Sequence, residues 1–287
     1  MRLSVTHTTT YRYGDAASLC HTEARLAPRT LATQTLLEHE LIITPRPDLT
    51  ISRRDYFGNA VAYFSITRPH RALTVTARSL VERIAAAPIE LAATPPWESV
   101  AAEFAPGGAA AARDDGEFVF APPDQPPSRA CAEYAAASFT PGRPILVAAR
   151  DLCARIHRDF RYDPSATAVN TTVDEAMRLR AGVCQDFAQV MIACVRAIGL
   201  PARYVSGYLR SGRFSIGAEA SHAWAAVFAP GAGWIDFDPT NDVMPSDRHV
   251  TVAWGRGYAD VAPVKGVALG GGDQAISVAV EVTPARE

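Results

Sequence analysis

The chain has 287 residues, a formal net charge of −2 and 20% charged residues. This length suits one large or two ordinary domains. The balanced charge excludes the basic surface that nucleic-acid binding requires, and no run of 18 consecutive apolar residues indicates a membrane span. We therefore expect a globular protein that has neither nucleic acid nor membrane as a partner. Composition does not determine its oligomeric state.

The cysteines indicate a reduced environment. There are five, an odd number without paired spacing: Cys20, Cys131, Cys153, Cys184 and Cys194. Because the first ten residues also lack the apolar stretch of a signal peptide, we expect a cytoplasmic protein with free thiols. No CxxC or HExxH motif occurs, so we expect neither a structural nor a protease-type zinc site.

Residues 1–95 predict an N-terminal all-β domain of sandwich-like form. Short alternating runs are separated by proline and glycine, as in small sandwiches and barrels. Gly58-Asn59, between two of these runs, can supply the positive φ of a hairpin turn. The expected strands cover 3–13, 36–44, 51–56, 60–67 and 72–84.

The rest of the chain divides into three segments. Residues 96–127 are rich in proline and alanine and are expected to form a connector. Residues 128–265 predict a catalytic core of helices followed by strands. Residues 249–272, which run past the end of this core, are expected to be irregular. Residues 266–287 contain an alternating run, Ala275–Val282, which needs a sheet edge for its backbone and an apolar surface for its valines. We expect this strand to join the N-terminal sheet.

One cysteine stands at the start of a predicted helix. Gly182 allows a tight turn just before Cys184. The apolar residues that follow recur with helical spacing: Phe187, Val190, Met191, Cys194, Val195 and Ile198. In the first turn, free backbone N–H groups and the helix dipole favour a thiolate, and Asp186 opposes it unless this carboxylate points away. A cysteine at a helix start is more often a small buried residue, so the residues downstream must decide.

A histidine and an aspartate downstream complete a candidate triad. A cysteine nucleophile needs a base, and the base needs a third group that sets its tautomer. His222 begins a predicted strand, and pairing Phe228 with Trp234 across the next loop puts Asp238 diagonal to His222 on the same face. Tightening the register by two residues puts Asp238 directly opposite. Both registers select Asp238 and leave Asp236 as a solvated strand residue.

Four motifs resemble the bacterial transglutaminase-like superfamily in their order and spacing: Gly-Val-Cys184-Gln-Asp-Phe-Ala, Pro-Ala-Arg-Tyr-Val-Ser-Gly-Tyr208-Leu, Ser-His222-Ala-Trp and Gly-Trp-Ile-Asp-Phe-Asp238-Pro-Thr240-Asn. The opening Thr-Thr-Thr-Tyr11-Arg-Tyr13 resembles the N-terminal β domain of the same proteins. The resemblance implies an α+β fold with a papain-like, transglutaminase-like catalytic core and the triad Cys184, His222 and Asp238. One stretch departs from the family, which usually has Gly-Arg-Asp-Tyr where this chain has Gly255-Arg256-Gly257-Tyr258.

The chemistry that we expect is acyl transfer on a peptide or protein substrate through a thioester, without cofactor or metal. The backbone N–H of Cys184 is a natural oxyanion donor, and Gln185 and Tyr162 are candidates for a second donor. Trp224 and Tyr208 are candidates for lining the acyl pocket.

The family's bacterial members include proteases and amidases as well as cross-linking enzymes, so fold does not decide the reaction. We expect hydrolysis, as in a cysteine peptidase or amidase. A protein-glutamine γ-glutamyltransferase and a non-catalytic binding module of the same fold are the alternatives. The two enzymes differ in whether water or an amine reaches the thioester, which the sequence does not reveal.

Overall fold

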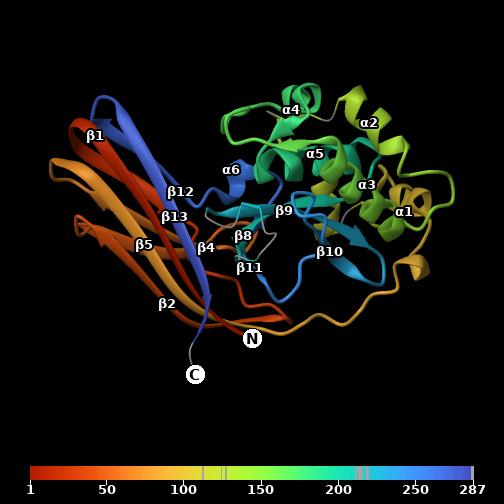
Figure 1. Ribbon diagram of the computed structural model, residues 1–287, viewed down its shortest axis with the longest axis horizontal. Helices are drawn as coiled ribbons and strands as arrows, with labels where there is room; N and C mark the ends of the chain where they lie inside the picture. Colours follow the sequence, from red (N-terminus) through yellow and green to blue (C-terminus); the bar gives the residue numbers. More distant parts are fainter. Residues whose placement is uncertain are drawn as a thin grey trace.

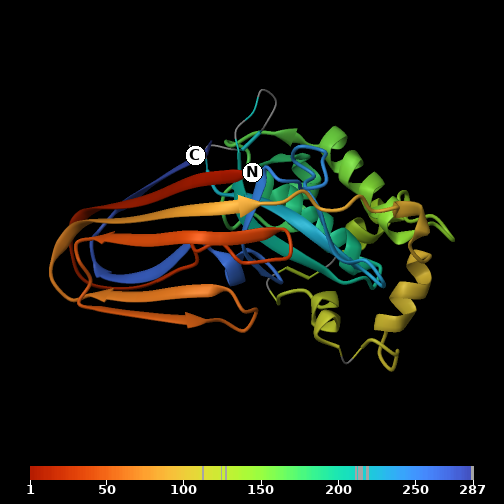
Figure 2. The same ribbon diagram turned by 90° about the horizontal axis from the view of Figure 1, so that it is seen from below.

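The computed structural model describes residues 1–111, 113–123, 125–126, 128–210, 212, 216–217 and 220–285. An all-β region, built mainly from the N-terminal strands, stands beside a part that mixes helices and strands (Figure 1). Viewed from below, the long strands of the β region and the helices lie at opposite ends of the molecule (Figure 2). Within the described residues, no helix is both long and apolar enough to cross a membrane.

The β region is one sheet of seven strands. These are β1 (Arg2–Ala24), β2 (Gln34–Thr44), β3 (Leu49–Arg54), β4 (Ala60–Ile66), β5 (His70–Arg83), β12 (Val264–Gly270) and β13 (Gln274–Pro284). The order is β2-β5-β1-β4-β3, and β12 and β13 both pair with β1. The hairpin between β3 and β4 turns at Gly58, whose φ of 73° is the positive value that the Gly-Asn pair predicts.

The two C-terminal strands run as one long strand beside β1. β12 pairs with the second half of β1, and β13 pairs with Leu3–Tyr13 in the first half. The glycine-rich break between them is held by a hydrogen bond from the Gly14 N–H to the Asp273 carbonyl oxygen (2.7 Å). Along β13, Val280 and Val282 pack against the main core. The alternating terminal run therefore has both the sheet edge and the apolar contact that it needs.

The mixed part packs helices on a four-stranded sheet of order β10-β9-β8-β11. Its strands are β8 (Ala202–Leu209), β9 (His222–Ala229), β10 (Gly233–Phe237) and β11 (His249–Gly255), and a short parallel pair, β6 (Arg161–Tyr162) and β7 (Ala181–Gly182), lies ahead of them. Its helices are α1 (Trp97–Phe104), α2 (Arg129–Ala136), α3 (Ile145–Asp159), α4 (Val173–Leu179), α5 (Cys184–Ala197) and α6 (Tyr258–Val261), with 3₁₀ turns η1 (Leu91–Ala93) and η2 (Asp114–Val119). The predicted apolar stripe buries α5 against β8, β9 and α2.

Two segments are more regular than predicted. The expected connector, 96–127, contains α1, whose Val100 and Phe104 lie one turn apart and are buried in the main core. The expected irregular stretch, 249–272, contains β11, α6 and β12. β11 is buried on both faces, polar residues included, and its partners are distant in the chain. The prediction that 249–272 is irregular is wrong, and the helix within 96–127 was not predicted, because the burial of both comes from partners that are distant in the chain.

The free edge of β11 is covered by the β region. The Gln34 amide donates to the Thr251 carbonyl oxygen (2.7 Å) and accepts the Thr251 N–H (2.9 Å). The Asn59 amide binds Trp254 in the same way, at 2.8 and 3.0 Å. These side chains replace the hydrogen-bond ladder that an edge strand lacks. They hold β11, and with it His249, in place.

Ending the chain after Gly272 is expected to destabilise the β region first. The hydrogen-bond ladder of β13 over Leu3–Tyr13 would be lost, and the core would lose Val282, which is 6% exposed. Amide hydrogen exchange, measured against the full chain, should show protection lost in β1 before α5. Loss of protection around Cys184 while β1 stays protected would show that β13 chiefly supports the helical part.

Candidate active site

The start of α5 holds Cys184 in the first helical turn, as predicted. Asp186 caps this helix, because its Oδ2 accepts the Val183 N–H (2.8 Å) and the Thr167 hydroxyl (2.7 Å). Burial raises the pKa of Asp186, and these donors oppose the rise. A Cβ at Gly182 would stand 2.4 Å from the same Oδ2, so glycine is required just before the cap. The carboxylate is thus engaged in the cap that supports the cysteine.

The thiol of Cys184 lies beside the first residues of β9. Its Sγ is 3.9 Å from the carbonyl oxygen of Ser221, the residue before His222. Cys184 and His222 both line a cavity of about 780 Å³. The nucleophile and the base expected from the sequence therefore meet at one cavity wall, although they come from a helix and a strand.

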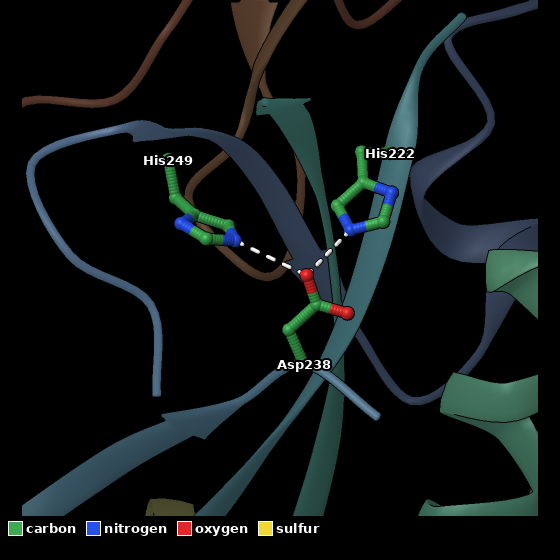
Figure 3. A group of neighbouring side chains, drawn as sticks. All are labelled: His222, Asp238 and His249. Atoms are coloured by element: carbon green, nitrogen blue, oxygen red, sulfur yellow. Dashed lines mark hydrogen bonds and ion pairs between the residues drawn. The ribbon is translucent and has the colours of Figure 1, made fainter. Parts of the chain in front are cut away.

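Asp238 faces His222 from the end of β10. Figure 3 shows the two side chains joined through His222 Nε2 and Asp238 Oδ2, which are 2.8 Å apart. The strand register that brings them together is the predicted one, with Trp234 opposite Phe228. Asp238 directly follows β10, whose last residues lie beside the start of β9.

Asp236 is not the solvated residue that the register argument expected. It is half-buried, and burial raises its pKa against the opposing charge of Arg203. The Arg203 guanidinium lies over the rings of Trp234 and Trp254, at 4.5 and 3.8 Å from their centroids. Asp236 thus belongs to a cluster of charged and aromatic side chains. The prediction failed because the alternation of residues along a strand does not reveal which distant side chains, such as Arg203, pack on that face of the sheet.

Asp238 accepts hydrogen bonds at both carboxylate oxygens. Oδ1 receives the backbone N–H groups of Thr240 (2.9 Å) and Asn241 (3.2 Å). Oδ2 receives His222, the Asn241 amide (2.8 Å) and His249 (3.2 Å). Burial would raise the pKa of this carboxyl, but His222 and His249 hold it well below its usual range. Asp238 is therefore an anion that keeps a proton on Nε2 of His222.

The other ring nitrogen of His222 is left for the cysteine. With Nε2 donating, the neutral ring carries its lone pair on Nδ1. Nδ1 is buried, and it has no hydrogen-bonding partner among the residues that the structure describes. Burial alone lowers the pKa of His222, but Asp238 and then Cys184 raise it to about 10. The site therefore favours an imidazolium at His222, next to Cys184.

A second histidine binds Asp238 on the side opposite His222 (Figure 3). Nδ1 of His249 accepts the Ser246 N–H (3.4 Å), so the ring proton is on Nε2 and is donated to Asp238. Burial lowers the pKa of His249, against the pull of Asp238. His222, Asp238 and His249 are close enough to hold a metal ion, but their ligand atoms already share protons in one hydrogen-bond chain.

His249 and Asn241 are site residues that the sequence reasoning missed. Asn241 ends the motif that contains Asp238 and Thr240, and His249 begins the stretch that was expected to be irregular, so neither was given a role. The signal that could have identified them is their polarity in segments that are otherwise buried. His249 is 4% exposed, and a buried imidazole needs a partner.

Replacing His249 with leucine should lower kcat by about 10-fold, because Asp238 loses a buried donor and part of its orientation. His249→Gln, whose amide can still donate, should recover most of the rate. The alkaline limb of the pH dependence of kcat/KM shows whether His249 positions Asp238 or only fills space in the core. Asp238 without this donor should bind the His222 proton more strongly and move the limb to higher pH. A slower His249→Leu enzyme with an unmoved limb would indicate a packing role.

Two further predicted residues lie in the cavity wall. Tyr162 and Gln185 both line it beside Cys184. The Gln185 side chain donates its Nε2 hydrogen to the Val169 carbonyl oxygen (3.0 Å). Its amide is therefore committed to the neighbouring loop in this conformation, and the helix N-terminus offers the better-placed donors for an oxyanion.

Trp224 and Tyr208, the expected lining of the acyl pocket, do not reach the cavity. They are 0% and 2% exposed, and neither belongs to its wall. Trp224 packs edge-on against His249, and the Tyr208 hydroxyl binds Nδ1 of His7 in β1 (3.1 Å). Both aromatic side chains support the site from inside the core. Their places in the wall are taken by Tyr258 and other residues that the spacing did not single out.

Comparisons with known proteins show which family the chain belongs to. A bacterial transglutaminase-like N-terminal region matches residues 3–82, and a transglutaminase-like superfamily model matches residues 132–239. An uncharacterised protein of Mycobacterium tuberculosis is 40% identical over 99% of this chain and 93% of its own length. The chain belongs to the transglutaminase-like superfamily.

Two more proteins resemble this transglutaminase-like chain. The crystal structure of a candidate cysteine protease from Cytophaga hutchinsonii has a TM-score of 0.76 and 22% identity, covering 100% of this chain and 91% of its own. It shows that the fold is shared over the whole length. A Pseudomonas aeruginosa protein-glutamine γ-glutamyltransferase is 34% identical over 97 residues, which are 31% of this chain and 14% of that enzyme.

Iodoacetamide should label Cys184 before the other four cysteines of this transglutaminase-like protein. Those four are 1% exposed or less, whereas Cys184 is 9% exposed at the cavity wall. Cys131 is the informative competitor, because a hydrogen bond from Cys194 lowers its pKa to about 6 while burial denies access. Peptide mapping after brief labelling tests this. First reaction at Cys131 would mean that thiol pKa and not access controls labelling.

Proposed function

We propose that this protein is a cysteine-dependent peptidase or amidase, which hydrolyses a peptide or carboxamide bond through a thioester. The observation that carries the proposal is the chain from Asp238 through His222, whose Nδ1 is left open beside Cys184. A nucleophile, a base and an orienting carboxylate are the three groups that thiol acyl transfer needs. They stand on three different elements that share one core.

In the first half-reaction, the Cys184 thiolate attacks the carbonyl carbon of the substrate. The oxyanion that forms is stabilised by N–H groups at the start of α5, which have no partners within the helix. The His222 imidazolium gives its Nδ1 proton to the leaving amine as the C–N bond breaks. The acyl group is then held on Sγ as a thioester.

In the second half-reaction, His222 takes a proton from water, and the resulting hydroxide attacks the thioester carbonyl. The C–S bond breaks, the carboxylic acid leaves and the sulfur returns to the thiolate, while the proton on Nδ1 restores the imidazolium. Asp238 stays ionised and holds the ring throughout. The substrate in this proposal is a peptide or protein, and the cavity of about 780 Å³ is large enough to hold several of its side chains.

Transfer to an amine is the second candidate. The similarity to the Pseudomonas aeruginosa protein-glutamine γ-glutamyltransferase supports it. The same thioester would form from a glutamine carboxamide, with loss of ammonia. A primary amine would then attack in place of water and give its proton to His222. No residue of the triad needs to change role between the two reactions.

A peptide library treated in the presence of a fluorescent primary amine tests both candidates. Mass spectrometry should find cleaved or deamidated peptides if the protein is a hydrolase, and amine-bearing peptides if it is a transferase. Cys184→Ala is the control and should yield neither product. The thioester proposal fails if the library is unchanged by the wild-type protein, or if Cys184→Ala gives the same products.

A further inference from the structure

One wall of the active-site cavity comes from the β region. Val278 of β13 lines the cavity together with Cys184 and His222. Figure 1 shows β13 beside β1, within the sheet formed mainly by the N-terminal strands, and this strand also contacts β8 of the catalytic core. The long pairing with β1 holds Val278 in place, with Thr9 opposite it.

On one face of β13, the side chains become more exposed from Val282 toward Ile276. Val282 is 6% exposed, and Val280 packs against the same core cluster. Val278 and Ile276, the next two positions on that face, are 43% and 55% exposed. The core therefore ends between Val280 and Val278, and the apolar strand face continues beyond it. β13 thus presents an apolar side chain, that of Val278, to the cavity that Cys184 and His222 also line.

The described residues that line the cavity carry no formal charge apart from the catalytic groups. None of the described residues that line it is aspartate, glutamate, lysine or arginine. Besides Val278, its wall contains Tyr162, Val169, Tyr204 and Tyr258. A charged substrate side chain beside these wall residues would lose hydration without gaining an ion pair from them, whereas an apolar one would gain from burial.

We propose that the exposed apolar face of β13 is a substrate subsite, in which Val278 contacts an apolar side chain next to the reacting carbonyl. The preferred substrate is a neutral, apolar peptide segment, and the β region takes part in selecting it. This inference rests on the proposed thiol chemistry at Cys184. Because β13 is held by its pairing with β1, this pairing sets the position of the subsite and so affects which substrates react.

Alkylation of Cys184 by peptide affinity labels tests the subsite without knowledge of the natural substrate. Bromoacetyl-dileucine amide and dileucyl chloromethyl ketone place their side chains on opposite sides of the reactive carbon, and the matching diaspartate reagents are the comparison. Each rate is divided by the iodoacetamide rate of the same variant, which reports thiol reactivity alone. In the wild-type protein, at least one dileucine reagent should react about 10-fold faster than its diaspartate counterpart.

Val278→Asp should remove most of the preference for the dileucine reagent. Val278→Lys should reverse it, so that the diaspartate reagent reacts faster. Val267→Asp is the matched control, because this valine is also exposed on a C-terminal strand and lies outside the cavity wall. Val278→Thr keeps the shape of valine and guards against misfolding. It should lose part of the preference.

The inference is overturned if neither reagent pair is distinguished by the wild-type protein, or if Val278→Asp and Val267→Asp behave alike. Failure of iodoacetamide to label Cys184 at all would instead contradict the proposed thiol chemistry, so the two failures can be told apart.

Discussion

Replacing Cys184 with alanine is expected to remove turnover, a loss on the order of 10⁶-fold in kcat, while changing the free energy of unfolding by no more than about 1 kcal/mol. The sulfur is the atom that carries the acyl group, but its hydrogen bond to the Ser221 carbonyl oxygen is long, at 3.9 Å. Removing the sulfur should therefore abolish the reaction but remove few stabilising contacts. Steady-state kinetics and thermal unfolding measure the two effects on the same preparation.

Cys153→Ala is the matched control. Cys153 is 0% exposed within the stripe of α3 that faces the core, so its loss leaves a small cavity. This variant should unfold at a lower temperature and keep its kcat. If Cys184→Ala instead unfolds easily, or still turns over substrate, Cys184 is a structural residue and the thioester mechanism is wrong.

Asp238→Asn is expected to lower kcat by about 10⁴-fold, the effect of leaving the base in the wrong tautomer. Both oxygens of Asp238 face donors, two backbone N–H groups at Oδ1 and two histidines with the Asn241 amide at Oδ2. An asparagine NH₂ must therefore point at other donors in either orientation. Destabilisation of about 1–3 kcal/mol should accompany the loss of rate.

The same substitution should change the pH dependence. The His222 pKa is raised from 6.5 to about 10 in the folded protein, so its pairing with Asp238 stabilises the fold fully below about pH 6.5 and is lost as pH rises toward 10. The Asp238 pKa is lowered, so its share is present above about pH 4 and is lost on further acidification. The stability difference between wild type and Asp238→Asn should therefore be largest between about pH 4 and 6.5.

The alkaline limb of kcat/KM should move from the region of pH 10 toward 6.5 in Asp238→Asn. Asp236→Asn is the control from the same segment. It makes the same change of charge two residues away, and it should keep the limb in place and retain kcat within about threefold. Equal damage from the two substitutions would show that charge near the sheet, and not the bond to His222, controls the rate.

Much of the active site follows from local pattern. A 3.6-residue apolar stripe buries α5, and the stripe begins just after Cys184, so the thiol had to stand at the helix start. The short loop between Phe228 and Trp234 allows few registers, and each of those considered selects Asp238 for His222. These inferences hold because they depend on neighbours within a helix or a hairpin.

The errors have one physical cause, which is contact between segments distant in the chain. β11 was missed because the groups that bury it and bind its edge, such as Gln34, come from distant parts of the chain. Asp236 was expected to be exposed to solvent, but it is partly buried and lies near Arg203. Trp224 and Tyr208 are residue types that often line a pocket, but here both side chains are buried in the core. Val278 reaches the cavity through a strand pairing that periodicity alone does not specify.

Trapping the acyl-enzyme tests the central claim most directly. Protein mixed with a substrate from the peptide library is quenched in acid, digested and analysed by mass spectrometry. We predict an acyl adduct on the peptide that carries Cys184, which hydroxylamine removes as expected for a thioester, and no adduct in Cys184→Ala. Products that accumulate while Cys184 stays unmodified, or an acyl group found on another residue of the wild-type protein, would contradict the account.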